Sequence, residues 1–157
     1  MTPPPGEMSL QFRRVFQAPR EMVWAAWTER ERLEQWMCRD VPAHHPKYVE
    51  LDVRPGGRYV IEIPLKDGKY IGQGIFREVR PPEKLAFTWS WSRQPEKPGE
   101  DLGGDSLVTV ELFDRGASTE MLFTHIGFDR TEILEETRTG WSGCFEVLAR
   151  ALAGSLS

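Results

Sequence analysis

Cysteine and histidine are scarce in this chain, which limits the metal and disulfide chemistry that it can support. Its 157 residues include 2 cysteines and 3 histidines. Cys38 and Cys144 lie far apart and form no Cys-x-x-Cys pair, so we expect free thiols in a reducing cytoplasm. His44 and His45 are adjacent, but neighbours in an extended loop point apart, and no carboxylate or cysteine follows at ligand spacing. We therefore expect neither a metal ion nor a cofactor.

Long apolar runs and an excess of basic residues are also missing. No stretch approaches the ~20 apolar residues of a transmembrane helix, and the proline-rich residues 1–7 lack the apolar core of a secretory signal. The 20 Lys and Arg residues are scattered among 24 Asp and Glu residues, giving a formal net charge of −4. Nucleic acids and anionic membrane surfaces need clustered basic residues, so we expect neither partner and expect a cytoplasmic protein.

The sequence lacks the short motifs of several enzyme classes. It contains no Gly-x-Ser-x-Gly elbow, phosphate-binding loop or dinucleotide fingerprint, because Gly72 and Gly74 lie within a strand pattern. The Asp and Gly residues within 101–105 lack the ligand pattern of a calcium loop and are typical of a surface loop. Cys38 has no placed base that would make it a nucleophile. These absences predict no convincing catalytic constellation.

Aromatic residues are abundant, with 6 Trp, 3 Tyr and 8 Phe. Each ring can bury ~150–250 Å² of surface, so these side chains are expected to dominate the core. A chain of 157 residues is near the commonest size for one domain. We expect a flexible N-terminal tail over residues 1–7 and one domain over residues 8–157.

Alternation of apolar and polar residues predicts about seven strands. Met8, Leu10 and Phe12 begin the first strand, and turn signals such as Pro55-Gly56-Gly57 and Asp67-Gly68 separate later ones. The later strands are predicted near residues 49–54, 58–65, 69–79, 85–92, 106–113 and 118–125. Short connections favour antiparallel neighbours.

Helical spacing predicts two short helices after the first strand and one long helix at the C-terminus. Pro19 suits the first turn of a helix, and Val23 and Trp27 then share a face. Thr28 with Glu31 forms a capping-box pattern that would begin the second short helix. The long helix is predicted from apolar residues at spacings of three and four: Trp141, Cys144, Phe145, Leu148, Ala151 and Leu152.

This order of elements, together with several motifs, resembles the activator-of-heat-shock-ATPase-like family of the SRPBCC (START-like, Bet v-like) superfamily. The motifs are Ala18–Trp24, Trp27-Thr28, Arg54–Gly57, Glu78–Leu85, Phe87–Trp89 and Gly140-Trp141, and the resemblance covers roughly residues 8–154. It implies an α+β helix-grip fold, in which a curved antiparallel sheet of about six to seven strands wraps around the C-terminal helix. It also implies an elongated cavity, which the superfamily uses for lipids, hormones, polyketides and aromatic acids.

Strand and helix periodicity select the side chains that would line such a cavity. The candidates are Trp36, Tyr59, Ile61, Ile63, Phe87, Trp89, Trp91, Met121, Phe123, His125, Trp141, Phe145 and Leu148. The inward face of the strand over 69–79 stays open. The alternative is that these side chains fill the core. A dry apolar void of ~300 Å³ would cost ~7 kcal/mol at ~24 cal/mol per Å³, so we expect a cavity that is small, hydrated or occupied.

His125 is the polar residue of greatest chemical interest, because it ends an otherwise apolar inward face. There an imidazole could orient a ligand or move a proton, with Tyr59 or a water as helper. The alternative is a core histidine that is hydrogen-bonded to backbone or water.

Three functions follow from these patterns. The first is binding of a small hydrophobic or aromatic ligand, lipid-like or polyketide-like, between the sheet and the C-terminal helix. The second is an enzyme of cyclase, dehydratase or hydrolase type that acts on such a ligand through His125. The third is a chaperone ATPase co-factor or other protein-interaction role, as the resemblance implies, although residues 1–7 are too few to replace the additional N-terminal domain of the eukaryotic co-chaperones. A weak homodimer stays open.

Overall fold

The computed structural model describes residues 8–39, 41, 43–100 and 102–155. In these residues seven strands and three helices occur in the order that the sequence predicts. They are β1 (Met8–Phe16), α1 (Arg20–Thr28), α2 (Arg30–Trp36), β2 (Lys47–Leu51), β3 (Arg58–Leu65), β4 (Gly68–Arg80), β5 (Lys84–Gln94), β6 (Ser106–Arg115), β7 (Ser118–Phe128) and α3 (Thr131–Ser155). The predicted α+β architecture with two early short helices is confirmed.

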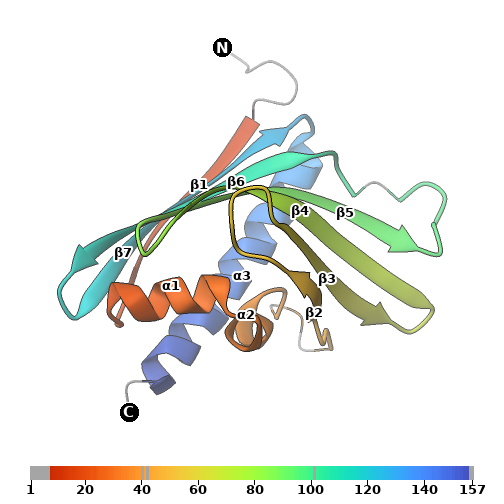
Figure 1. Ribbon diagram of the computed structural model, residues 1–157. Helices are drawn as coiled ribbons and strands as arrows, with labels where there is room; N and C mark the ends of the chain where they lie inside the picture. The colour runs from red at the N-terminus through yellow and green to blue at the C-terminus, as the bar shows by residue number, and fades with distance from the viewer. Residues whose placement is uncertain (1–7, 40, 42, 101, 156–157) are drawn as a thin grey trace.

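All seven strands form one antiparallel sheet in the order β1-β7-β6-β5-β4-β3-β2. Hairpins connect β2 to β7 in sequence, whereas β1 pairs with the last strand, so that Phe12 lies opposite Phe123. The sheet curves, and α3 runs obliquely across it with α1 and α2 nearby (Figure 1). This arrangement places α3 in contact with α1, α2, β1 and β7.

The buried face of α3 carries the residues that helical spacing predicts. Trp141, Cys144, Phe145 and Leu148 are all buried. Phe145 packs edge-on against Phe12 of β1, with ring centroids 5.4 Å apart. None of the helices in the described ranges is both long and apolar enough to cross a membrane.

Gly72 and Gly74 lie on the inward face of β4, the face that the sequence left unassigned. A Cβ at Gly74 would lie 1.9 Å from the carbonyl oxygen of Thr88, and one at Gly72 would lie 2.8 Å from Cγ2 of Ile61. No other residue fits without movement of the neighbouring strand or side chain. Phe76 on the same face is buried, and Tyr59 packs against it at 5.7 Å between ring centroids.

The capping box that the sequence predicts at the start of α2 is wrong. Thr28 is the last residue of α1, and its hydroxyl donates a hydrogen bond of 2.8 Å to the carbonyl of Trp24. A threonine inside a helix commonly bonds to the carbonyl four residues earlier, so its oxygen no longer caps the next helix. Glu29 occupies the N-cap of α2 without a side-chain cap.

Candidate functional site

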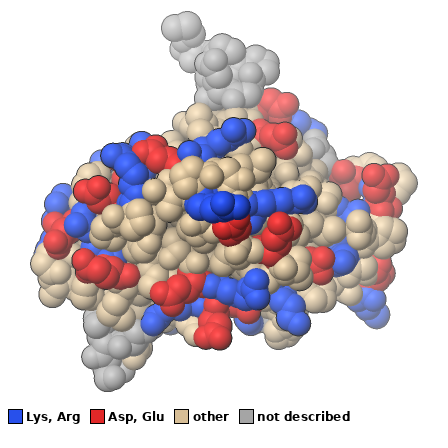
Figure 2. Space-filling view, in the orientation of Figure 1, with Lys and Arg blue, Asp and Glu red and all other residues tan. Residues whose placement is uncertain are grey.

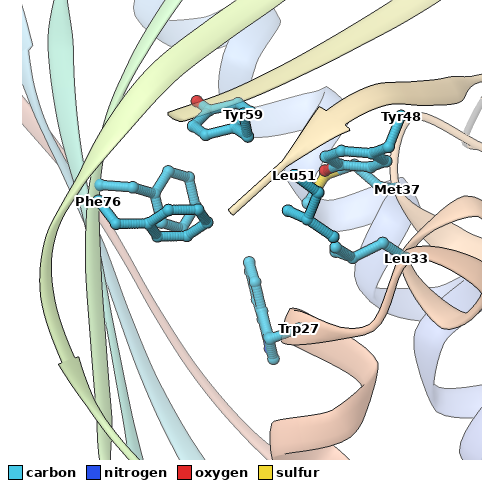
Figure 3. Close-up of a pocket in the computed structure, with 8 residues that line it drawn as sticks. Trp27, Leu33, Met37, Tyr48, Leu51, Tyr59 and Phe76 are labelled. Atoms are coloured by element: carbon cyan, nitrogen blue, oxygen red, sulfur yellow. The ribbon is translucent and has the colours of Figure 1, made fainter. Parts of the chain in front are cut away.

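Aromatic rings fill the interior where the sheet faces α1, α2 and the middle of α3. Trp27 lies at the centre, with its ring centroid 4.7 Å from that of Trp36 and 6.2 Å from that of Phe123. Figure 3 shows side chains from both helices and strands converging around a small void. Its volume is about 10 Å³, at or below the ~10–15 Å³ that one water needs. This part of the interior has no room for an organic ligand.

A larger hollow, which we call the end pocket, lies between the N-terminal half of α3 and the ends of β3, β4 and β5. Its volume is about 260 Å³, and it opens to solvent. The lining residues are Met37, Cys38, Val41, His44, Ile63, Tyr70, Trp91, Leu102, Ile133, Glu136, Thr137, Gly140, Trp141 and Cys144. They come from the α2–β2 segment, three strands, the β5–β6 segment and α3. The walls are mainly apolar.

The structure separates the residues predicted to line one cavity. Ile63, Trp91 and Trp141 line the end pocket. The others are buried and do not line it: Trp36, Tyr59, Ile61, Phe87, Trp89, Met121, Phe123, His125, Phe145 and Leu148. Tyr59 and Phe87 line the small central void. Trp89 and His125 line a hollow of about 30 Å³ that shares four residues with the end pocket: Trp91, Leu102, Ile133 and Thr137. The rings of the buried residues explain the division, because Trp141 lies 4.6 Å from Phe123 and 5.1 Å from Trp89 between centroids. These contacts close the space between α3 and the middle of the sheet.

His125 is 1% exposed and is hydrogen-bonded through both ring nitrogens. The indole N–H of Trp141 donates to Nδ1 at 3.0 Å, so the neutral imidazole carries its proton on Nε2. Nε2 lies 2.6 Å from Oγ of Ser106, whose hydroxyl donates to the carbonyl of Trp89 at 3.1 Å. Burial lowers the pKa of His125 to about 3. The side chain is therefore neutral and fully bonded at neutral pH.

Tyr59, which the sequence offers as a helper for His125, is also committed to a bond in the core. Its hydroxyl donates to the carbonyl of Thr88 at 2.6 Å. Burial raises the pKa of the Tyr59 phenol well above its ordinary value, which keeps it protonated. Neither Tyr59 nor His125 lines the end pocket.

The wall of the end pocket formed by β4 is braced by a polar cluster. The Tyr70 hydroxyl donates to Oε2 of Glu100 at 2.8 Å, and this bond raises the pKa of Tyr70. The Arg93 guanidinium lies 5.3 Å from the centre of the Tyr70 ring, and it donates to Asp67 at 3.0 Å. Through Glu100 the cluster ties the β5–β6 segment to the sheet. Leu102 of that segment lines the pocket.

Several residues of the end pocket were absent from the sequence prediction. The helical spacing of α3 identifies some of them. Ile133, Thr137 and Gly140 line the pocket from the same face of α3 as Trp141. They continue its spacing of three and four toward the N-terminus of the helix. By contrast, the α2–β2 and β5–β6 segments have no periodicity, so sequence alone has no means of placing them beside α3.

No metal centre is apparent in the described part of the chain. None of its His, Cys, Asp and Glu side chains gather in groups of three or more that could hold a metal ion. Lys and Arg alternate with Asp and Glu over the face shown in Figure 2.

A further hollow of about 420 Å³ lies beside α2. It is a poor apolar site, because its lining residues are Glu29, Arg30, Glu31 and Leu51.

Comparisons with known proteins give the chain a family. A family model described as "Activator of Hsp90 ATPase homolog 1-like protein" matches residues 17–153. No curated protein matches the chain. Protein CV1439 from Chromobacterium violaceum is 23% identical, with a TM-score of 0.79 over 92% of this chain and 96% of that one.

Two further solved structures agree with the first. The AHSA1 protein from Silicibacter pomeroyi is 22% identical, with a TM-score of 0.77 over 94% of this chain and 99% of that one. A protein from Arthrobacter aurescens is 23% identical, with a TM-score of 0.78 over 94% of this chain and 87% of that one. At these identities the neighbours show the fold alone.

Proposed function

We propose that this protein is a small-molecule binding module. The chain belongs to the Activator of Hsp90 ATPase homolog 1-like family, within the SRPBCC superfamily. The ligand is a small hydrophobic or aromatic molecule, and its site is the end pocket. The observation that carries the proposal is a hollow of about 260 Å³ with mainly apolar walls between α3 and the sheet.

The volume of the end pocket sets the size of the ligand. An apolar cavity of ~150 Å³ holds one benzene ring, so a pocket of about 260 Å³ suits a fused two-ring compound or a short branched chain. The indoles of Trp91 and Trp141 contribute apolar surface to its walls. Aromatic ligands would stack or meet these rings edge-on, which adds ~0.5–1.5 kcal/mol per ring pair beyond the burial of area.

Energetics also favour an apolar occupant. Because the end pocket opens to solvent, water enters it when no ligand is bound. Each Å² of apolar surface removed from water contributes about 25 cal/mol. Replacement of water by an apolar molecule is therefore favourable at these walls.

Binding is favoured over the acid–base enzyme hypothesis by the placement of His125. Both of its ring nitrogens are engaged, and the ring lines a neighbouring hollow of about 30 Å³, which is too small for an organic ligand. A general base must reach the proton that it removes. His125 does not line the end pocket, and its two nitrogens are already committed to Trp141 and Ser106, so it is poorly placed to remove a proton from a ligand held there.

The test is a thermal shift measurement with a panel of one- and two-ring apolar compounds. A ligand at 100 times its Kd adds ~2.7 kcal/mol to the free energy of unfolding, which raises the Tm of a domain of this size by ~5–10 °C. Thr137→Trp should abolish the shift by filling the pocket from α3. Thr139→Trp is the matched control, because Thr139 is exposed on the same helix and does not line the pocket.

Two outcomes count against the proposal. If no compound in the panel shifts the Tm of the wild-type protein, the end pocket is not a binding site for this class of molecule. If Thr137→Trp keeps the shift that Thr139→Trp shows, the ligand binds elsewhere.

A further inference from the structure

We propose that the end pocket selects aromatic ligands that carry a protonated amine over ligands that carry a carboxylate. This inference rests on the proposed function and adds the charge of the ligand to it. The argument comes from the charged and aromatic side chains that line the pocket.

Among the described residues, the lining of the end pocket includes one carboxylate and neither Lys nor Arg. Glu136 supplies the carboxylate, and His44 contributes an imidazole. Proteins that bind carboxylate ligands commonly supply a guanidinium, whose paired N–H groups match the two oxygens. The end pocket offers none.

The Arg93 guanidinium behind the β4 wall does not change this balance. It lies over the ring of Tyr70, which lines the pocket, and it is paired with Asp67 at 3.0 Å. A second carboxylate, that of Glu100, lies 3.8 Å from its Nε. With two acids beside one guanidinium, the cluster presents no net positive charge to a ligand.

Glu136 differs from the acids next to it on α3. Glu132 pairs with Arg130 at 3.8 Å, and Glu135 pairs with Arg138 at 3.2 Å. Glu136 has no ion-pair partner among the described residues and is exposed at the edge of the pocket. Its carboxylate can therefore meet a ligand ammonium, whereas a ligand carboxylate would meet a like charge.

Aromatic rings add to the preference for a cation. Tyr70, Trp91 and Trp141 line the pocket, and the first two lie 6.4 Å apart between ring centroids. The face of an aromatic ring attracts an ammonium group and gives nothing comparable to a carboxylate. Arg93 already lies over one face of Tyr70, so Trp91 and Trp141 are the rings that, with the Glu136 carboxylate, make the chemical elements of an amine site.

Three ligands with one skeleton and different charges test the inference: tryptamine, 3-ethylindole and indole-3-propionate. Each is titrated into ¹⁵N-labelled full-length protein, and binding is followed through the side-chain N–H signals of Trp91 and Trp141. We expect tryptamine to bind about threefold to tenfold more tightly than 3-ethylindole, and indole-3-propionate to bind most weakly. The advantage of tryptamine should shrink as salt is raised, because Glu136 is exposed.

Matched variants assign the effect to Glu136. Glu136→Gln should lower the affinity for tryptamine about threefold or more and leave the affinity for 3-ethylindole unchanged. Glu135→Gln removes the same charge one residue away, outside the pocket lining, and should leave both affinities unchanged.

The outcomes separate this inference from the proposed function. Equal affinities for all three ligands, or preference for indole-3-propionate, would overturn selection for an amine while leaving the binding function in place. A tryptamine preference that survives in Glu136→Gln would overturn the role of that carboxylate. Absence of binding by all three ligands would overturn the amine inference, and the proposed function falls with it only if no compound of the thermal shift panel binds.

Discussion

Acid should destabilise this fold through His125, before most carboxylates become protonated. The imidazole has a pKa of about 3 in the folded protein because burial disfavours its charged form. In the unfolded chain the pKa of histidine is ~6.5. Between these two values the unfolded state binds a proton that the folded state does not, so stability falls as the pH falls. The contribution is complete above about pH 6.5 and is lost as the pH drops toward about 3.

The size of the effect follows from the gap between the two pKa values. Each pH unit in this window is worth ~1.36 kcal/mol, so a drop to pH 5 costs ~2 kcal/mol and a drop to pH 3 costs ~5 kcal/mol. The hydrogen bonds of His125 explain why protonation in the folded state is unfavourable. Protonation would put a proton on Nδ1, which faces the N–H of Trp141 at 3.0 Å and cannot then accept from it.

Urea denaturation of the wild-type protein and of His125→Gln at pH 7.5, 6, 5 and 4.5 measures this contribution. The variant should be less stable at pH 7.5 by ~1–3 kcal/mol, because it loses bonds to Trp141 or Ser106. Its stability should then fall less steeply, by ~2 kcal/mol less than the wild type between pH 7.5 and 5. His44 and His45 are present in both proteins and cancel in the comparison. Parallel stability profiles for the two proteins would refute the argument.

Two other predictions concern the sheet. Gly74→Ala should cost ~3 kcal/mol or more in urea denaturation, because its Cβ would lie 1.9 Å from the carbonyl oxygen of Thr88. Gly104→Ala, with nothing within 4 Å of its Cβ, is the control and should stay within ~0.5 kcal/mol of the wild type; similar losses in both variants would contradict the packing argument. Tyr70→Phe removes the bond of 2.8 Å to Glu100, so hydrogen exchange should accelerate in the β5–β6 segment while global stability changes by only ~1 kcal/mol. Unchanged exchange there would show that the bond does not hold the segment.

Local patterns in the sequence were sufficient for the elements and their order. The strand predicted at 58–65 is β3, and the strand predicted at 69–79 differs from β4 by one residue at each end. Alternation, turn residues and helical spacing act over a few positions, so they can be seen without knowledge of the fold. The capping box predicted at Thr28 was wrong because the local pattern does not show which backbone group the hydroxyl bonds. In the structure it donates to the carbonyl of Trp24 in α1.

The place of the hollow could not be predicted from these patterns. Alternation identified which rings face inward, and most of them are buried, but it carries no information on the distance between α3 and each strand. That distance is small at Phe123, whose ring centroid is 4.6 Å from that of Trp141. It widens toward the ends of β3, β4 and β5, where the end pocket lies.

By itself, the sequence determined the fold class, the inward faces of most strands and the family of this protein. Only the tertiary structure decided that the interior is filled at its centre and hollow at one end, and that His125 bonds to Trp141 and Ser106. The physical reason is the separation along the chain over which each effect acts. Periodicity reflects the backbone of one element, whereas packing depends on side chains brought together from elements far apart in the chain.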